Sequence, residues 1–263
     1  MIDLHSHILP GIDDGSPDLE TSLAMARMAV ADGIRVMACT PHIYPGMFEN
    51  ERTGIEAAIA ALRQALAEAG IPLQLVAGAD THLVPGLLGR LRAGEIPTLA
   101  GSAYLLLEPA HHVVPPGFEA AVFEIVAAGY VPVITHPERL TWIGDHYESF
   151  GRLVKGGAWM QITSGSLTGG FGSEARYWGE RMLDEGLVHI LASDAHGVGR
   201  RAPLLAEGVE VARRWVGREE AARLIGERPA CILENRASGE VPAPSRRAAA
   251  EAKGLFSRWF NKK

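Results

Sequence analysis

Histidine and carboxylate side chains recur along this chain at spacings that suit the binding of divalent cations. Residues i and i+2 of an extended segment point to the same face, so His5 and His7 in DLHSH can reach one cation. The same spacing joins Asp194 and His196 in LASDAHG. Imidazole and carboxylate without thiolate are typical of Mn²⁺, Fe²⁺ or Zn²⁺ in a hydrolytic centre, and this ligand set argues against a structural cysteine-type zinc site.

Two further carboxylates, Asp13 and Asp14, follow within the opening sequence MIDLHSHILPGIDDG. They lie in a glycine-containing turn between LPG and Gly15. We expect a carboxylate from this turn to fold back toward the histidines of the first strand.

The rest of the pattern indicates the elements that must position these side chains. Short apolar runs rich in Val, Ile and Leu alternate with helix-length amphipathic segments, and several of these end at a glycine suited to a left-handed cap. Short helix-to-strand connections of this kind favour parallel strands with right-handed crossovers. Seven strand-and-helix units suit a closed barrel. We therefore predict an α/β fold, a distorted TIM-like (β/α)₇ barrel. The predicted strands are 2–5, 34–39, 73–77, 103–107, 131–135, 158–162 and 188–192, the predicted helices include 19–31, 54–69, 119–128 and 174–185, and the glycines are Gly33, Gly70, Gly129 and Gly186.

Polar side chains follow most of the predicted strands at their carboxyl ends, where parallel α/β folds place their chemistry. One histidine alone is more often a core or surface residue than a ligand, but six of seven strand exits carry ligand-capable residues. Chance does not explain that distribution. The sixth strand is the exception, because Gln161, Thr163 and Ser164 in QITSGS are weaker ligands. The other exits carry His5 and His7, His42 in CTPH, Asp80 and His82 in GADTH, Glu108 in LLLEP, His136 and Arg139 in ITHPER, and Asp194 and His196.

Five histidines receive no assigned role from the sequence. We expect His111, His112 and His146 in loops and His189 in a strand, and His82 is left open because it lies so near Asp80.

Length and composition exclude several classes of protein. The chain has 263 residues, a net charge of −6 and a pI near 5.9, which suit one globular domain and give no reason to expect binding to nucleic acid. We find no leader pattern and no apolar run long enough to span a membrane, so we expect a cytoplasmic protein. Cys39 and Cys231 are too few for a disulfide framework, and neither has an arginine six positions later, which excludes a cysteine-dependent phosphatase loop.

The composition changes near residue 237. We predict a barrel domain over residues 1–236 and a flexible basic tail over 237–263, which carries six Lys or Arg against two Glu. Two interpretations stay open for this tail. It is a solvated disordered segment, or its basic residues and Leu255, Phe256, Trp259 and Phe260 contact an anionic membrane surface or a partner.

The motifs DLHSH, DDG, TPH, LLLEP, THPER and SDAHG, in this order across residues 1–236, resemble the polymerase and histidinol phosphatase (PHP) superfamily. Within it they are most similar to bacterial metal-dependent tyrosine-protein phosphatases associated with capsule and exopolysaccharide synthesis. This resemblance implies a distorted (β/α)₇ barrel holding two or three metal ions, usually manganese, with iron or zinc as alternatives. Carried over motif by motif, the implied ligands are His5, His7, Asp14, His42, Asp80, Glu108, His136, Asp194 and His196.

The resemblance also implies two arginines that bind the substrate phosphate. Arg139 in HPER matches the first, and Arg201 is the better match for the second, although Arg200 is adjacent. The family usually has Glu at the position of Asp80, and the shorter side chain puts occupancy of a third metal in doubt.

The implied reaction is hydrolysis of phosphotyrosine by water activated between two cations, with His196 as a candidate for assisting the leaving group. The implied substrate is a phosphotyrosine protein, for example the kinase that controls polysaccharide assembly, at the inner face of the membrane.

Three alternative functions stay open beside this one. A small-metabolite phosphoesterase, for example one acting on histidinol phosphate, uses the same metals. An amidohydrolase is disfavoured because many use a carboxylated lysine, whereas Lys155, Lys253, Lys262 and Lys263 lie at no strand exit. A non-catalytic regulator that keeps metals for folding is disfavoured by the complete ligand set with both arginines.

Overall fold

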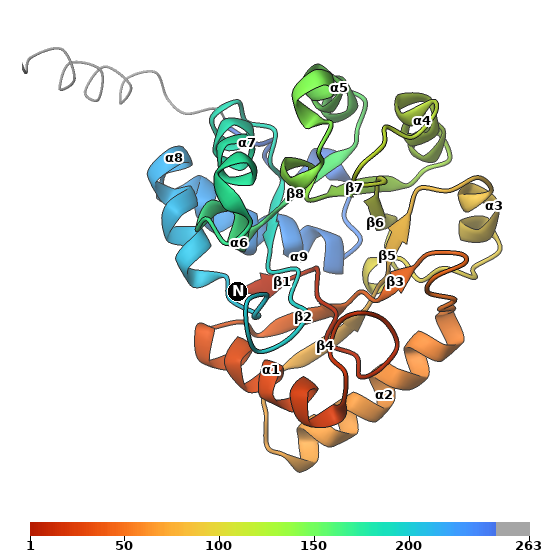
Figure 1. The fold of residues 1–263 in the computed structure, drawn as a ribbon, viewed down its shortest axis with the longest axis vertical. Coiled ribbons are helices and arrows are strands. Elements are labelled where there is room, and N and C mark those ends of the chain that lie inside the picture. Colours follow the sequence, from red (N-terminus) through yellow and green to blue (C-terminus); the bar gives the residue numbers. More distant parts are fainter. Residues whose placement is uncertain (246–263) are drawn as a thin grey trace, which may run out of the picture.

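The strands of the computed structural model, which describes residues 1–245, form a parallel ring surrounded by helices (Figure 1). Neighbouring strands pair in parallel throughout the described residues, in two runs whose orders are β1-β2-β4 and β3-β5-β6-β7-β8-β9. The strands are β1 Ile2–Asp3, β2 Val36–Cys39, β3 His42–Ile43, β4 Gln74–Ala77, β5 Asp80–His82, β6 Tyr104–Glu108, β7 Val131–Thr135, β8 Trp159–Thr163 and β9 Ile190–Ala192.

The two runs are halves of one sheet, because the second and third predicted strands each continue, after a short break, in an additional strand that the sequence did not predict. β2 pairs with β4 and β3 pairs with β5, and in both pairs the partner lies 38 residues later in the chain, so the register continues across the gap. Pro41 stands between β2 and β3 and has no N–H to donate to a ladder. Its carbonyl still accepts a hydrogen bond from the Asp80 backbone N–H at 3.1 Å. The interruption therefore accounts for the short additional strands β3 and β5.

The ring closes between the first and last strands. Ser6 forms an isolated parallel bridge with Ala195, just beyond the ends of β1 and β9. The His7 backbone N–H donates to the Ala195 carbonyl at 2.8 Å, and the Asp194 N–H donates to the His5 carbonyl at 2.9 Å. The prediction of a closed seven-unit α/β barrel is confirmed.

Helices cover the outside of the ring, with α1 and α2 below and α3 to α8 around the remaining sides in Figure 1. The four predicted cap glycines all have positive φ, and Gly33, at 96°, donates its backbone N–H to the last turn of α1. The helices are α1 Leu19–Asp32, α2 Arg52–Glu68, α3 Leu87–Arg92, α4 Phe118–Ala127, α5 Ile143–Lys155, α6 Ser164–Leu167, α7 Gly172–Asp184, α8 Ala206–Ile225 and α9 Glu227–Leu233, with short 3₁₀ turns η1 Leu99–Gly101, η2 Pro137–Arg139 and η3 Ser238–Glu240.

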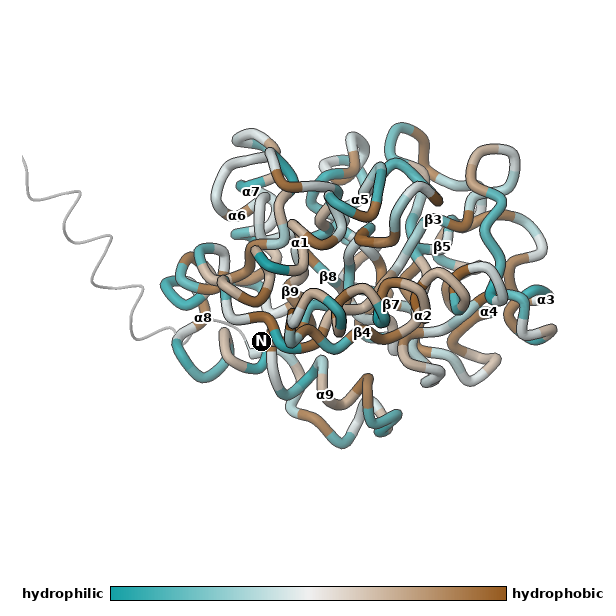
Figure 2. The backbone as a smooth tube through the Cα atoms, turned by 90° about the horizontal axis from the view of Figure 1, so that it is seen from below, coloured by the Kyte–Doolittle hydropathy of each residue, from teal (hydrophilic) through white to brown (hydrophobic). Residues whose placement is uncertain are grey.

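Side chains alternate along each strand between two hydrophobic clusters. Leu105 and Leu107 of β6 belong to the larger cluster, which includes the helix faces, whereas Tyr104 and Leu106 belong to a smaller one. The smaller cluster joins residues of several strands to Cys231 of α9, so this helix closes the amino-terminal end of the barrel. Figure 2 shows the hydrophobic stretches running through the central strands.

The chain beyond α9 continues to pack against the barrel. Val241 is buried in the smaller cluster, and Arg228 Nε donates to the Pro242 carbonyl at 3.1 Å. The rest of the predicted tail, 246–263, lies outside the described residues. Within residues 1–245, no helix combines the length and the apolar character needed to cross a membrane.

Candidate metal centre

His5 and His7 follow β1 and turn their rings to the same side. Their Nε2 atoms lie 3.2 Å apart, and both side chains are buried. Ser6, between them, points elsewhere and donates its hydroxyl to the Ala38 carbonyl at 2.6 Å. Gln161 Oε1 lies 2.9 Å from His5 Nδ1, where it can accept that proton and leave Nε2 free as a ligand. Gln161, predicted to be a weak ligand, is placed to orient a stronger one.

Asp13 holds the second histidine in place. Its Oδ2 lies 2.7 Å from His7 Nδ1 and also accepts the His42 backbone N–H at 3.1 Å. The turn that carries Asp13 approaches the first strand so closely that a Cβ on Gly15 would lie 2.2 Å from the His7 carbonyl oxygen. Only glycine fits there, so the turn folds back over the site as predicted.

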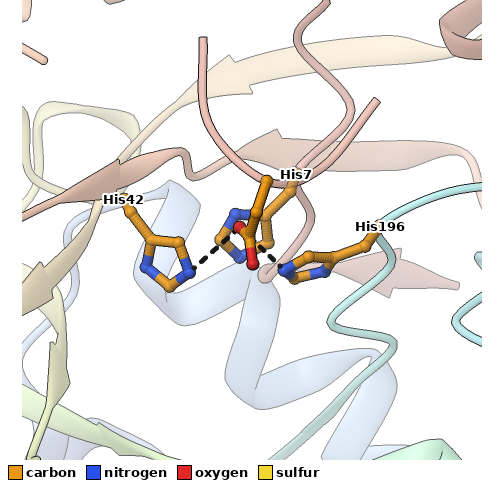
Figure 3. Close-up of side chains that lie close together, drawn as sticks. His7, His42 and His196 are labelled. Atoms are coloured by element: carbon orange, nitrogen blue, oxygen red, sulfur yellow. Dashed lines mark ion pairs between the residues drawn. The ribbon is translucent and has the colours of Figure 1, made fainter. Parts of the chain in front are cut away.

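Asp14 instead faces a group of three imidazoles. Its Oδ1 lies 3.4 Å from His196 Nε2 and 3.5 Å from His42 Nε2. The rings of His7 and His196 are 3.9 Å apart at their centroids, and Figure 3 shows how the three imidazoles converge from different segments. The ligand atoms of these four residues lie within 4.8 Å of one another, a spacing that one cation can bridge.

Asp80 and Asp194 flank His5 at the centre of the cluster. His5 Nε2 lies 3.3 Å from Asp80 Oδ2 and 3.3 Å from Asp194 Oδ1. Burial disfavours the charged imidazole, but these two carboxylates outweigh burial and raise the pKa of His5 to about 9. Burial likewise opposes ionisation of Asp194, yet neighbouring histidines and arginines hold its pKa well below the ordinary value. Cation ligation by His5 must therefore displace a proton.

Glu108 lies between two pairs of histidines. Its Oε2 is 2.6 Å from His82 Nε2 and 3.3 Å from His42 Nδ1. Its Oε1 is 3.2 Å from His111 Nε2 and 3.6 Å from His136 Nε2. Each side forms a group of one carboxylate and two imidazoles with the spacing of a cation site.

Two arginines meet the cluster at Asp194. Arg139 and Arg201 both donate to Asp194 Oδ2, and the Arg201 contact measures 2.7 Å. Phe171 lies beneath them, with its ring centroid 4.3 Å from the Arg139 guanidinium carbon and 6.0 Å from that of Arg201. Arg200 turns away and donates to the Gly170 carbonyl at 3.0 Å. The structure therefore brings Arg201, rather than Arg200, beside Arg139.

The buried acceptors of this cluster suit divalent cations. Among the described residues, both Asp80 carboxylate oxygens and Asp194 Oδ1 are buried without a hydrogen-bond partner. Buried carboxylates left in that state are costly unless a cation or proton compensates them. All nine predicted ligands belong to groups with cation-binding spacing, so the sequence-predicted set converges in space.

Comparison with known proteins then identifies the family. The family model described as capsular polysaccharide synthesis, CpsB/CapC, matches residues 1–234. The chain belongs to the CpsB/CapC family. This confirms the resemblance found in the motifs.

Named relatives of this CpsB/CapC-family chain are tyrosine-protein phosphatases. The chain is 35% identical over 235 residues to tyrosine-protein phosphatase YwqE of Bacillus subtilis, covering 89% of this chain and 92% of that protein. It is 30% identical over 244 residues to tyrosine-protein phosphatase CpsB of Streptococcus agalactiae serotype V, covering 89% and 99%.

Solved structures agree with this family. One from the crystal structures of YwqE from B. subtilis and CpsB from Streptococcus pneumoniae, described as unique metal-dependent tyrosine phosphatases, matches with a TM-score of 0.86 at 34% identity over 94% of this chain and 100% of that one. An organophosphorus hydrolase from Deinococcus radiodurans matches with a TM-score of 0.53 at 16% identity, over 88% of this chain and 92% of that one, and it shows the fold alone.

Four residues contact the cation cluster or the arginine pair of this CpsB/CapC-family chain, although its sequence assigned them no function there. His111, expected in a loop without a function, and His82 both contact Glu108, Asp13 orients His7, and Phe171 underlies the arginines. His82 carried a signal, because it lies two residues after Asp80 on one strand. No sequence signal marks His111 or Phe171, because both lie in connections between secondary-structure elements, and hydrophobic periodicity does not specify the path of a connection. His146 lies in α5 rather than in a loop.

Proposed function

We propose that this chain is a metal-dependent protein-tyrosine phosphatase, a phosphoric monoester hydrolase that acts on phosphotyrosine in proteins. The observation that carries the proposal is the meeting of Arg139 and Arg201 at Asp194, on the edge of the histidine and carboxylate cluster. A cluster suited to cations and a pair of guanidinium groups thus share one rim. That pairing suits the hydrolysis of a phosphate ester, because both groups bind and stabilise phosphate oxygens.

The proposed metal ligands are those that the motifs predict, and we propose two or three cations for the cluster. We propose manganese as the working metal, with iron or zinc as substitutes, because imidazole and carboxylate ligands accept all three. Bound divalent cations supply Lewis acidity, which lowers the pKa of water and neutralises phosphate charge. The ligands are His5, His7, Asp14, His42, Asp80, Glu108, His136, Asp194 and His196.

Arg139 and Arg201 bind the phosphate oxygens that the cations leave free. Each presents planar N–H donors, and together they stabilise the charge that spreads over those oxygens in the transition state. Phe171 restricts both guanidinium groups from one side. When a phosphate arrives, the arginines exchange their bonds to Asp194 for bonds to the substrate.

His196 serves this site better as a ligand than as a proton donor. Burial and the nearby His7 charge lower the pKa of His196 to about 4, so its ring is neutral at pH 7. The phenolate of tyrosine has a pKa of ~10 and needs less assistance in leaving than an alkoxide. The predicted role of His196 in assisting the leaving group is therefore secondary to ligation.

A cavity of about 250 Å³ beside the arginines offers a place for the tyrosine ring. It is lined by Arg139, His111, Phe171 and Thr141, among others, so it adjoins both the cation cluster and the guanidinium pair. We propose phosphotyrosine segments of a polysaccharide-synthesis tyrosine kinase as the natural substrate. We propose that the phosphatase acts on this substrate in the cytoplasm, at the inner face of the membrane.

The test is hydrolysis of a phosphotyrosine peptide by the full chain after reconstitution with Mn²⁺, with chelated protein as the control. Histidinol phosphate is the comparison substrate. Mn²⁺-dependent turnover of the peptide that exceeds turnover of histidinol phosphate supports the proposal. A preference for histidinol phosphate would instead indicate a small-metabolite phosphoesterase, and metal binding without turnover would indicate a regulator.

The role of the basic tail requires a separate measurement. Liposome flotation with anionic and neutral vesicles distinguishes membrane contact from a solvated segment. The shortened chain should end at residue 245 rather than 236, because Val241 packs in the core and Arg228 binds the Pro242 carbonyl.

A further inference from the structure

His111 is the histidine of the site that its sequence motifs leave without a role. We propose that His111 is a metal ligand, which completes a cation position with Glu108 and His136. The inference rests on the proposed function, because it requires cations at this rim. It extends that function by assigning one position its third protein ligand.

The three side chains converge on one point. His111 Nε2 lies 3.2 Å from Glu108 Oε1, and His136 Nε2 lies 3.6 Å from the same oxygen. All three ligand atoms fall within 4.8 Å of one another. Two imidazoles and one carboxylate form a set that binds a first-row divalent metal and leaves coordination positions open. Those positions are accessible to substrate, since His111 also lines the cavity beside Arg139.

The connection that carries His111 is fixed by three hydrogen bonds. The Thr141 backbone N–H and hydroxyl both donate to the His111 carbonyl, at 3.0 and 3.1 Å. Trp142 Nε1 donates to the neighbouring Ala110 carbonyl at 2.9 Å. Thr141 and Trp142 follow shortly after His136, so one stretch of chain positions both imidazoles. A ligand must be held in this way if its binding geometry is to form without reorganisation.

Asp80 does not occupy the role assigned to His111. The Asp80 Oδ2 faces His5 Nε2 at 3.3 Å, and its cation-spaced group consists of His5, His7 and Asp80. Within residues 1–245, the groups that contain Glu108 have histidines as their other members. The third ligand available to Glu108 and His136 is therefore His111.

The opposite side of Glu108 differs, although it also carries two histidines. His42 already directs Nε2 to Asp14, at 3.5 Å, and its Nδ1 lies between Glu108 Oε2 at 3.3 Å and Asp80 Oδ2 at 3.5 Å. His82 Nε2 lies 2.6 Å from Glu108 Oε2, nearer than any of the three other imidazoles around this carboxylate. His82 is further held by stacking on Tyr44, with ring centroids 4.0 Å apart. These contacts fix the Glu108 carboxylate so that Oε1 faces His111 and His136.

The test measures Co²⁺ binding to the full chain after removal of metals with a chelator. Equilibrium dialysis with metal analysis gives the number of equivalents, and visible absorption of the Co²⁺ complex gives the affinity. We expect His111→Ala to lose one equivalent or to bind it at least about 100-fold more weakly. His112→Ala is the matched control, because His112 is the adjacent exposed histidine, and it should keep every equivalent.

Anomalous diffraction from the unsubstituted chain loaded with Co²⁺ tests the inference without any variant. A Co²⁺ peak at bonding distance, about 2.1 Å, from His111 Nε2 and His136 Nε2 supports it. A peak bonded to His136 and Glu108 but beyond bonding distance of His111 overturns it, as does unchanged Co²⁺ binding by His111→Ala. In either overturning case, Mn²⁺-dependent turnover of the phosphotyrosine peptide would leave the proposed function standing. A chain that binds no Co²⁺ overturns both.

Discussion

The two ends of the barrel are built from the same strands but have opposite character. On β6, Tyr104, Leu106 and Glu108 share one face, yet Tyr104 and Leu106 lie in the small hydrophobic cluster and Glu108 lies among histidines. At the amino-terminal end the interior is sealed by Trp159 of β8 and by α9. Position along a strand, rather than the strand itself, therefore decides whether an inward side chain belongs to the core or to the site.

Both ends bury charge, but they compensate it differently. At the amino-terminal end Arg228 is fully buried and pairs with Glu220 at 2.7 Å, so the charge is balanced within the protein. At the carboxyl-terminal end Asp80 is fully buried and its oxygens lack hydrogen-bond partners among residues 1–245. The guanidinium that faces Glu220 keeps its charge, whereas the imidazoles that face Asp80, His5 at 3.3 Å and His42 at 3.5 Å, can give up a proton to a cation, so the carboxyl-terminal end is the one suited to a ligand.

The largest effect, a loss of catalytic turnover, should follow from removing the cations or a cation ligand at the carboxyl-terminal end. Chelation, or His136→Ala, should lower turnover of a phosphotyrosine peptide by more than about 10,000-fold, ~5.5 kcal/mol of transition-state stabilisation. The physical reason is that His136 contributes to two groups with cation-binding spacing. Steady-state kinetics together with metal analysis measures this effect. Near-normal turnover in the chelated protein would contradict the site assignment.

The matching change at the amino-terminal end should affect stability. Arg228→Ala removes the closer of the two arginines that pair with buried Glu220 and leaves Arg223 at 3.3 Å, and we expect a loss of about 3 kcal/mol in the free energy of unfolding. Urea unfolding followed by circular dichroism measures it. The control is Arg176→Ala, which removes the exposed pair with Glu180 and should cost less than about 1 kcal/mol. Equal losses of unfolding free energy in the two variants would show that the buried pair stabilises the protein no more than the exposed pair does.

A smaller effect separates the two functions of the carboxyl-terminal end, binding cations and binding phosphate. Arg139→Ala should lower kcat/KM about 100-fold, because one set of donors to the phosphate is lost, while the metal content stays unchanged. Arg200→Ala is the control, since Arg200 bonds the Gly170 carbonyl. Kinetics and metal analysis on the same preparations decide the matter. Loss of metal from Arg139→Ala would mean that the arginine supports cation binding, through its contact with Asp194, and does not act only on the phosphate.

The smallest effect concerns a histidine at the amino-terminal end. Burial and the nearby Arg228 charge lower the pKa of His189 to about 3, below the unfolded value of about 6.5. The unfolded state therefore binds the proton first, and stability falls as pH drops from about 6.5 toward 3. At pH 5 the loss is ~2 kcal/mol. Unfolding experiments on His189→Gln should show a flatter pH dependence over this range, and an unaltered profile would exclude His189 as the cause.

The candidate site was predictable where its residues follow strands. His5 and His7 alternate with Ser6, and Asp194 and His196 alternate with Ala195, so a period of two fixes which side chains face together. The spacing alone groups Asp13 with Asp14, and only the motif distinguishes Asp14 as the ligand that the resemblance implies. The structure shows the reason, since Asp13 binds His7 Nδ1 from behind.

The sequence by itself determined the barrel, because repeated apolar runs and cap glycines are local signals that survive without tertiary contacts. Its motifs also predicted nine metal ligands, and those side chains lie together in groups with cation-binding spacing. Tertiary structure alone decided that β2 and β4 continue as β3 and β5 and that His111 returns to Glu108. It also brings Arg201, already the better motif match, rather than Arg200 to Asp194. Connections follow paths set by packing and by distant hydrogen bonds, such as those from Thr141 to the His111 carbonyl, and no local periodicity encodes them.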